Sequence, residues 1–181
     1  SVFTRHDILR SFSVNAEKLK VIPLGVGTQY RSLSDPARLD EFRKRHNLTR
    51  PYILYVGNVK PHKGIDTLVN AIRKSPPLAD FELVLVGGTI ETQSDLARQA
   101  DVAGIANRIR QLGRLNDQEL VSAYNAAEVL VMPSLYEGFG LPALEAMACG
   151  IPVVTSNGGS LPEIVGDAAV VFEAGNSDQL A

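Results

Sequence analysis

Residues 128–155 read EVLVMPSLYEGFGLPALEAMACGIPVVT, in which a glycine-containing loop and a helical stretch separate two apolar runs. The two runs, 128–132 and 152–155, have the length and the valine content of strands that are buried on both faces of a sheet. The helix is expected to open at about Leu141, with Pro142 in its first turn, where the missing N–H of proline costs no hydrogen bond. The order strand, loop, helix, strand predicts a pair of parallel strands.

The same alternation continues on both sides of this stretch. Between two of the runs, Ile65, Leu68 and Ile72 follow the spacing of an amphipathic helix. We therefore expect an α/β fold with a doubly wound, Rossmann-like parallel sheet, whose ligands bind beyond the carboxyl ends of the strands. Four further strands are expected at Tyr52 to Gly57, Phe81 to Gly87, Arg108 to Leu112 and Ala169 to Phe172.

The two ends of the chain depart from this pattern. Residues 1–25 hold short apolar stretches around a polar, weakly helical piece, and a helical stretch at 37–46 lies between turn-forming residues, as in a connector. Residues 176–181 resemble the start of a helix. We expect residues 26–181 to form one domain, residues 1–25 to be the remnant of another domain or a linker, and the chain to be part of a longer polypeptide.

Composition narrows the class of function. The chain has 181 residues, 45% of them hydrophobic, and a formal net charge of -2, so one core is expected and no basic stripe for nucleic acid. No apolar run approaches the roughly 20 residues of a membrane span. We expect a cytoplasmic location, with the full-length protein free to associate peripherally with a membrane. Cys149 is the only cysteine, and no His or Cys cluster has the spacing of a metal site, so we expect no disulfide, no metal and no bound cofactor.

The loop between the two apolar runs has the features of an anion site. Gly138 and Gly140 allow a ligand to approach the backbone closely, and the N–H groups and dipole of the following helix favour a phosphate. Glu145 lies one turn further along the helix, where its carboxylate can accept hydrogen bonds from two neighbouring hydroxyls, such as those of a ribose. Each feature alone also occurs in doubly wound proteins that bind nothing there. Two glutamates eight residues apart, Glu137 and Glu145, rarely flank Gly-Phe-Gly-Leu-Pro by chance.

A second loop agrees with the first. The stretch Val-Gly-Asn-Val-Lys-Pro-His-Lys-Gly at residues 56–64 follows a predicted strand and precedes a predicted helix. Lys63 can therefore project a cation toward a diphosphate at the tips of the strands.

The string from Pro133 to Gly150 resembles the E-x7-E region of retaining GT-B glycosyltransferases, especially those of family four. The resemblance implies that the chain is the C-terminal, nucleotide-sugar-binding half of a GT-B fold. It implies that Glu137 is the catalytic residue facing the donor sugar, and that Glu145 holds the ribose. The backbone expected to contact the sugar and the diphosphate is that of Gly138, Phe139, Gly140 and Leu141.

Lys63 matches the lysine that the family carries in the second loop, whereas Asn58 stands where the family usually has an arginine. Both are expected to line the donor site. The stretch from Arg110 to Leu112 resembles the strand end whose backbone meets the base, which makes both residues candidate donor contacts. The sequence Pro-His-Lys at residues 61–63 is similar to that of many mannosyltransferases, which favours GDP-mannose as the donor and leaves a UDP-sugar as the alternative.

The resemblance implies transfer of a sugar, with retention of anomeric configuration, from a nucleoside diphosphate sugar to a hydroxyl of an unknown acceptor glycan or lipid. The sequence has no Asp-x-Asp pair, and the scheme needs no metal. The N-terminal domain that carries the acceptor groove is missing, so the chain alone is expected to be inactive. A GT-B-type sugar-nucleotide epimerase, a glycogen-synthase-like transferase and a non-catalytic sugar-nucleotide-binding domain stay open. A dinucleotide-binding dehydrogenase is disfavoured, because no Gly-x-Gly-x-x-Gly follows the first clear strand.

Overall fold

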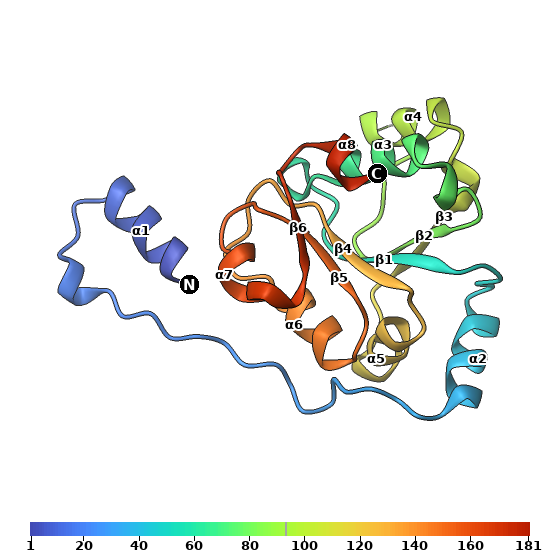
Figure 1. The fold of residues 1–181 in the computed structure, drawn as a ribbon, viewed down its shortest axis with the longest axis horizontal. Coiled ribbons are helices and arrows are strands. Elements are labelled where there is room, and N and C mark those ends of the chain that lie inside the picture. Colours follow the sequence, from blue (N-terminus) through green and yellow to red (C-terminus); the bar gives the residue numbers. More distant parts are fainter. Residues whose placement is uncertain (93) are drawn as a thin grey trace.

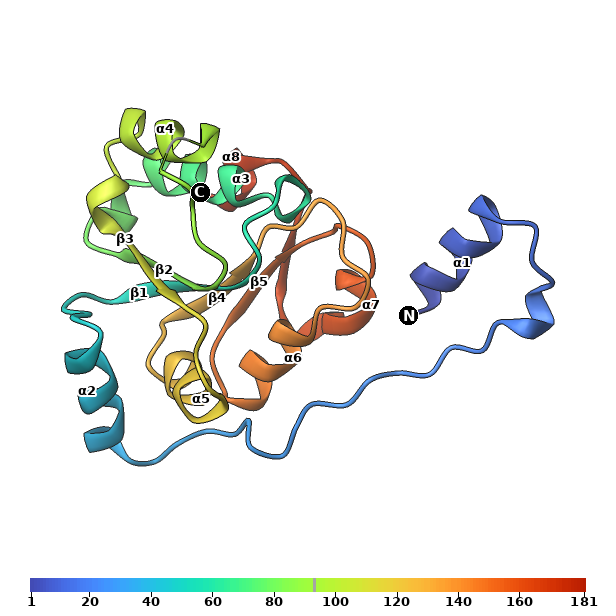
Figure 2. The ribbon, with the colours of Figure 1, turned by 180° about the vertical axis from the view of Figure 1, so that it is seen from behind.

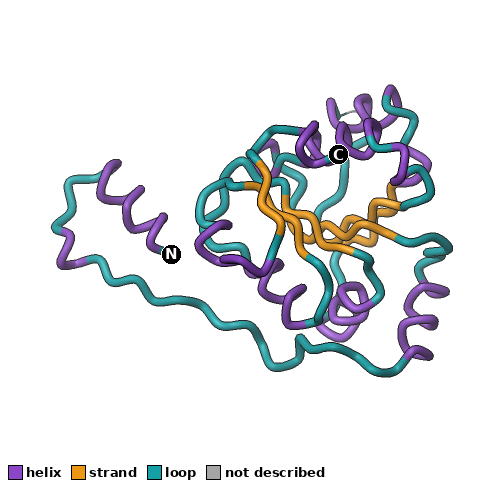
Figure 3. The backbone as a smooth tube through the Cα atoms, viewed as in Figure 1, coloured by secondary structure: helices purple, strands orange, loops and turns teal. Residues whose placement is uncertain are grey.

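A parallel sheet forms the centre of the molecule (Figure 1, Figure 3). The computed structural model describes residues 1–92 and 94–181, and within them the sheet has six strands in the order β3-β2-β1-β4-β5-β6, all paired in parallel. The predicted α/β fold is confirmed, and each predicted strand is found with its ends shifted by at most one residue. The strands are β1 (Tyr52–Gly57), β2 (Glu82–Gly87), β3 (Ile109–Gly113), β4 (Val129–Met132), β5 (Val153–Ser156) and β6 (Val170–Phe172).

Helices cover both faces of the sheet, with α3, α4 and α8 on one face and α2, α5, α6 and α7 on the other (Figure 1, Figure 2). The expected helices at 37–46, around 65–72 and from Leu141 are all present, whereas no helix had been predicted where α4 lies. The helices are α1 (Val2–Ser11), α2 (Pro36–Arg45), α3 (Ile65–Lys74), α4 (Asp95–Val102), α5 (Asp117–Asn125), α6 (Leu141–Ala148), α7 (Leu161–Val165) and α8 (Ser177–Leu180).

Two hydrophobic clusters lie on the two faces because successive side chains of a strand point in opposite directions. In β1, Tyr52 and Leu54 are packed in the cluster beneath α2, α5 and α6, while Ile53 and Tyr55 are packed beneath α3 and α4. All four side chains are buried. This double burial explains why β1 reads as a continuous apolar run.

The winding of the chain reverses between the two central strands. β1 leads into α3 on one face, whereas its neighbour β4 leads into α6 on the other face. After these two strands the chain therefore continues to opposite faces of the sheet. In doubly wound folds the ligand-binding crevice lies at this switch point.

The N-terminal segment lies apart from the sheet (Figure 1, Figure 2). α1 buries none of its residues, and an extended stretch connects it to α2. The N-terminal end of α1 faces α6 and α7. The assignment of residues 1–25 to another domain or a linker stays a prediction. None of the helices in the described ranges is both long enough and apolar enough to span a membrane.

Candidate functional site

The loops that follow β1 and β4 are joined at the switch point. Residues Pro61–Lys63 form a 3-10 turn, and the carbonyl of His62 accepts a hydrogen bond of 2.9 Å from the N–H of Leu135. Gly64 has a left-handed backbone (φ 64°), and a Cβ atom there would collide with the carbonyl of Pro133. Because only glycine fits this contact without a shift of the backbone, the two loops are held in a fixed relation.

Lys63 and Glu137, two charged residues of these loops, form an ion pair. Lys63 Nζ lies 2.7 Å from Glu137 Oε2, and the two side chains are only 19% and 15% exposed. The hydroxyl of Ser134 donates to the same carboxylate oxygen at 3.2 Å. The structure thus brings a cation and an anion together at the switch point of the sheet.

The glycine loop leads from Glu137 to the start of α6. Gly140 has a φ of 100° and occupies the N-cap position, and no side chain caps the helix. The loop is held from the β5 side, where the N–H and the hydroxyl of Ser160 donate to the carbonyl of Glu137 at 3.0 and 3.1 Å. A Cβ at Gly159 would collide with the Glu137 backbone. An uncapped helix start on a rigid loop is a site for an anion.

Glu145 projects from α6 beside two tyrosines that sequence reasoning missed. The Tyr124 hydroxyl donates to Glu145 Oε2 at 2.6 Å, and the ring of Tyr30 packs edge-on against Tyr124 at 5.9 Å. Burial, and secondly the Glu145 carboxylate, raise the pKa of Tyr124 above its ordinary value and that of Tyr30 to about 12. Both phenols are therefore protonated at neutral pH, and Tyr124 acts as a donor that orients the carboxylate.

The remaining candidates are distributed around this cluster. Asn58 is exposed in the loop after β1, and its carbonyl accepts a hydrogen bond of 2.7 Å from the Tyr55 hydroxyl. The guanidinium of Arg110 donates to Glu82 at the amino end of β2, at 2.8 Å, so the side chain is not brought to the cluster. Leu112 lies one residue before the carboxyl end of β3 and packs against the core. A backbone contact between this strand end and a base stays a prediction.

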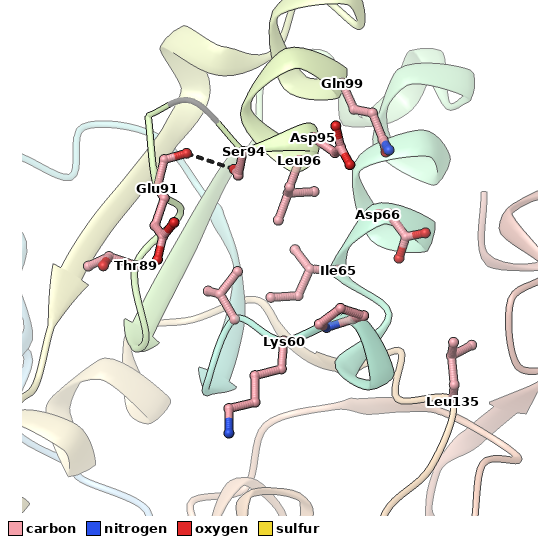
Figure 4. A pocket seen from close by; sticks show the side chains of 12 residues that line it. Lys60, Ile65, Asp66, Thr89, Glu91, Ser94, Asp95, Leu96, Gln99 and Leu135 are labelled. Carbon is pink, nitrogen blue, oxygen red and sulfur yellow. Dashed lines mark hydrogen bonds between the residues drawn. The ribbon is translucent and has the colours of Figure 1, made fainter.

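A pocket of about 550 Å³ opens beside the cluster, between the loops after β1 and β2 and the helices α3 and α4 (Figure 4). Asp66, Glu91 and Asp95 line it, and the Lys60 ammonium points away from Asp66 and Asp95. These carboxylates disfavour a diphosphate in this pocket. Among residues 1–92 and 94–181, no group of three or more His, Cys, Asp or Glu could hold a metal ion.

The chain is therefore a doubly wound, parallel α/β domain in which a lysine, a glutamate and an uncapped helix start lie at the switch point, where proteins of this class bind their ligands. The particular family follows from comparison with known proteins. Residues 37–181 match the family described as Glycosyl transferases group 1, and the chain belongs to this family. The resemblance to GT-B glycosyltransferases is confirmed.

Individual relatives agree with this assignment. The chain is 37% identical to the O-antigen chain mannosyltransferase B of Escherichia coli, over 100% of this chain and 48% of the relative. It is 36% identical, over 91% of its length and 44% of the relative, to a GDP-mannose-dependent alpha-(1-6)-phosphatidylinositol monomannoside mannosyltransferase of Mycobacterium tuberculosis. Anabaena HepE, solved in complex with UDP and glucose, superposes with a TM-score of 0.85 at 26% identity, over 98% of this chain and 49% of HepE. The chain spans about half the length of the relatives that it matches.

Proposed function

We propose that this chain is the donor-binding half of a retaining glycosyltransferase, which transfers a sugar from a nucleoside diphosphate sugar to an acceptor hydroxyl. The observation that carries the proposal is the Lys63–Glu137 pair at 2.7 Å, next to the uncapped start of α6. A diphosphate and a sugar need these two kinds of group side by side. Lysine and backbone N–H groups stabilise the phosphate oxygens, and a carboxylate accepts hydrogen bonds from sugar hydroxyls.

In the proposed reaction, the bond between the anomeric carbon and the diphosphate oxygen breaks, and a bond from this carbon to the acceptor oxygen forms. The acceptor hydroxyl loses its proton, and negative charge develops on the leaving diphosphate. Lys63 and the N–H groups of residues 138–141 stabilise this charge without a metal, because they are fixed before the reaction begins. Glu137 positions the sugar, and Glu145, oriented by Tyr124, holds the ribose.

We favour GDP-mannose as the donor. The support comes from the sequence Pro-His-Lys at residues 61–63 and from the mannosyltransferase relatives, one of which is GDP-mannose-dependent. A UDP-sugar is the alternative, supported by the UDP and glucose bound to HepE. The names of the two mannosyltransferases point to a glycan or a lipid as acceptor. The acceptor wall belongs to a preceding domain, of which residues 1–25 are the last part, and the chain alone transfers no sugar.

A thermal-shift panel of GDP-mannose, UDP-glucose and ADP-glucose tests the proposal, because a ligand that binds only the folded state raises the apparent stability. GDP-mannose is expected to give the largest rise in Tm, and EDTA is expected to leave it unchanged. If none of the three nucleotides raises the Tm, the proposed function is wrong. The full-length protein is expected to yield a product with the anomeric configuration of the donor, whereas release of an epimerised sugar nucleotide would favour the epimerase.

A further inference from the structure

The first turn of α1 contacts the glycine loop of the proposed donor site. The hydroxyl oxygens of Ser1 and Thr4 lie 3.0 and 3.1 Å from the carbonyl oxygen of Gly138 and 2.7 Å from each other, so the two hydroxyls and the carbonyl form one hydrogen-bonded cluster in which each hydroxyl has a single proton to donate. The same Ser1 hydroxyl caps the helix by accepting a hydrogen bond from the N–H of Thr4 at 3.1 Å. Two hydroxyls of a segment far away in sequence therefore converge on one carbonyl.

Glu163, in the first turn of α7, holds the same end of α1. Its two carboxylate oxygens accept hydrogen bonds from the backbone N–H groups of Val2 and Phe3 at 2.8 and 3.0 Å. The first N–H groups of a helix have no partner within the helix, and a carboxylate satisfies them well. The N–H of Val2, followed by that of Phe3, lowers the pKa of Glu163 below its ordinary value, so the carboxylate is ionised at neutral pH.

Tyr136 completes the contact from the loop itself. Its ring packs edge-on against Phe3, with the ring centroids 5.6 Å apart, and its hydroxyl donates to Asp7 at 2.6 Å. α1 buries no residue, so these polar and ring contacts at its first two turns hold it in place. They all lie on residues next to the Glu137–Gly140 loop or on α7.

The contact fixes the orientation of one peptide group. In a planar trans peptide the C=O and the next N–H point in opposite directions, so a Gly138 carbonyl held toward α1 aims the Phe139 N–H away from it. Within residues 1–92 and 94–181, no protein group accepts this N–H. A Cβ atom at Gly138 would meet no atom within 4 Å, and among the described residues the hydroxyls of Ser1 and Thr4 are the groups that contact the Gly138 carbonyl, so their loss leaves this carbonyl without a protein partner.

We propose that Glu163, Tyr136 and the Gly138 carbonyl form a docking surface for the first turn of α1, and that docking aims the Phe139 N–H at the phosphate or sugar oxygens of the donor. The second half of this statement rests on the proposed function, which puts the donor in the crevice. Docking and donor binding are then linked, and each strengthens the other by the same factor. Approach of the preceding domain, to which α1 is assigned above, organises the donor site.

Two substitutions undo the docking from opposite sides. Thr4→Val keeps the shape of the side chain and removes its hydroxyl, and Glu163→Gln keeps the length of the side chain and removes its charge. Each has a matched control among exposed residues that make none of these contacts, Ser11→Ala on α1 and Asp167→Asn after α7. Glu163 is exposed, so its substitution does not threaten the core.

GDP is the probe. Calorimetry is expected to show GDP binding weakened about three- to tenfold in Thr4→Val and in Glu163→Gln, the range for loss of a modest hydrogen bond. The double variant is expected to be little weaker than either single variant, because both lose the same docked state. Hydrogen exchange without ligand is expected to be faster at residues 136–142 in both variants than in their controls, and GDP is expected to slow exchange at residues 1–12 of the wild type.

The outcomes separate the two proposals. If Glu163→Gln speeds exchange at residues 1–12 and yet binds GDP as the wild type does, α1 docks but does not prepare the site, and the coupling is overturned. If the wild type binds no nucleotide, the proposed function fails. Hydrogen exchange without ligand still tests the docking surface in that case. Equal exchange rates at residues 136–142 in Glu163→Gln and Asp167→Asn would overturn it.

Discussion

Glu137→Gln is expected to strengthen the binding of a nucleoside diphosphate to the chain, and to abolish sugar transfer by the full-length protein. In the structure, Glu137 neutralises Lys63, the cation that the proposal assigns to the diphosphate, and it adds a negative charge near the anion. Glutamine keeps the length of the side chain and its ability to accept from Ser134, but it releases Lys63. If Glu137 competes with the diphosphate for Lys63, its removal raises the affinity for the nucleoside diphosphate. If Glu137 contacts the nucleotide instead, its removal lowers this affinity.

The magnitude follows from the ion pair. Two unit charges 2.7 Å apart, at an effective dielectric constant of about 20, attract each other by about 6 kcal/mol. Desolvation of the two side chains offsets most of this attraction. Exposed ion pairs contribute about 0–1 kcal/mol to stability, whereas loss of one partner from a fully buried pair costs about 3–5 kcal/mol. The partial exposure of both side chains leaves about 1 kcal/mol, which corresponds to an affinity for GDP about fivefold higher.

Calorimetry with GDP measures the affinity, and urea unfolding measures the stability, which is expected to fall by about 1 kcal/mol. Asp80→Asn is the control, because it removes one exposed negative charge just before β2, at the amino edge of the sheet. It is expected to change neither quantity. GDP binding that is weakened tenfold in a stable Glu137→Gln protein would refute the reasoning, because it would mean that the carboxylate contacts the nucleotide favourably.

Three further substitutions or treatments test neighbouring parts of the site. Tyr124→Phe is expected to weaken GDP binding about three- to tenfold by leaving Glu145 without its orienting hydrogen bond, and calorimetry with a 2′,3′-dideoxy nucleotide is expected to show no such loss. Burial raises the pKa of the Cys149 thiol to about 11, so a thiol reagent at pH 8 is expected to label the protein only after unfolding in urea. Asn58→Arg, with Asn58→Gln as control, is expected to strengthen GDP binding about fivefold by adding a cation to the loop, and unchanged affinity would place residue 58 outside the diphosphate site.

Strands β1, β2, β4 and β5 could be predicted because burial on both faces leaves a nearly continuous apolar run, as in Tyr52–Gly57. α4 could not be predicted for the opposite reason. Asp95–Val102 is short, four of its eight residues are polar, and Ala100 is its one buried residue, so the helix leaves little apolar stripe in the sequence. Its stability comes from packing against α3 and from its Ser94 cap.

The parts of the candidate site that lie on consecutive residues could be predicted from the sequence. The contacts between residues far apart in the sequence could not. The glycine loop and the cationic loop each lie on a few consecutive residues, so their position beyond strand ends follows from the pattern. The ion pair between Lys63 and Glu137 joins residues 74 positions apart. Tyr124 had the spacing of a core residue of α5, and the spacing of a helix does not reveal that its hydroxyl reaches Glu145 on the neighbouring α6.

The ion pair also bears on the order of events in the proposed reaction. In the free chain Lys63 and Glu137 satisfy each other, so a ligand must replace both partners to bind without loss. A nucleotide sugar does so, because its diphosphate pairs with the lysine and its sugar hydroxyls donate hydrogen bonds to the carboxylate. The nucleoside diphosphate left after transfer takes only the lysine, and it leaves a carboxylate that is 15% exposed without a cation and beside an anion. The same pair that accepts the donor therefore weakens the hold on the product, which favours its release once the sugar has left.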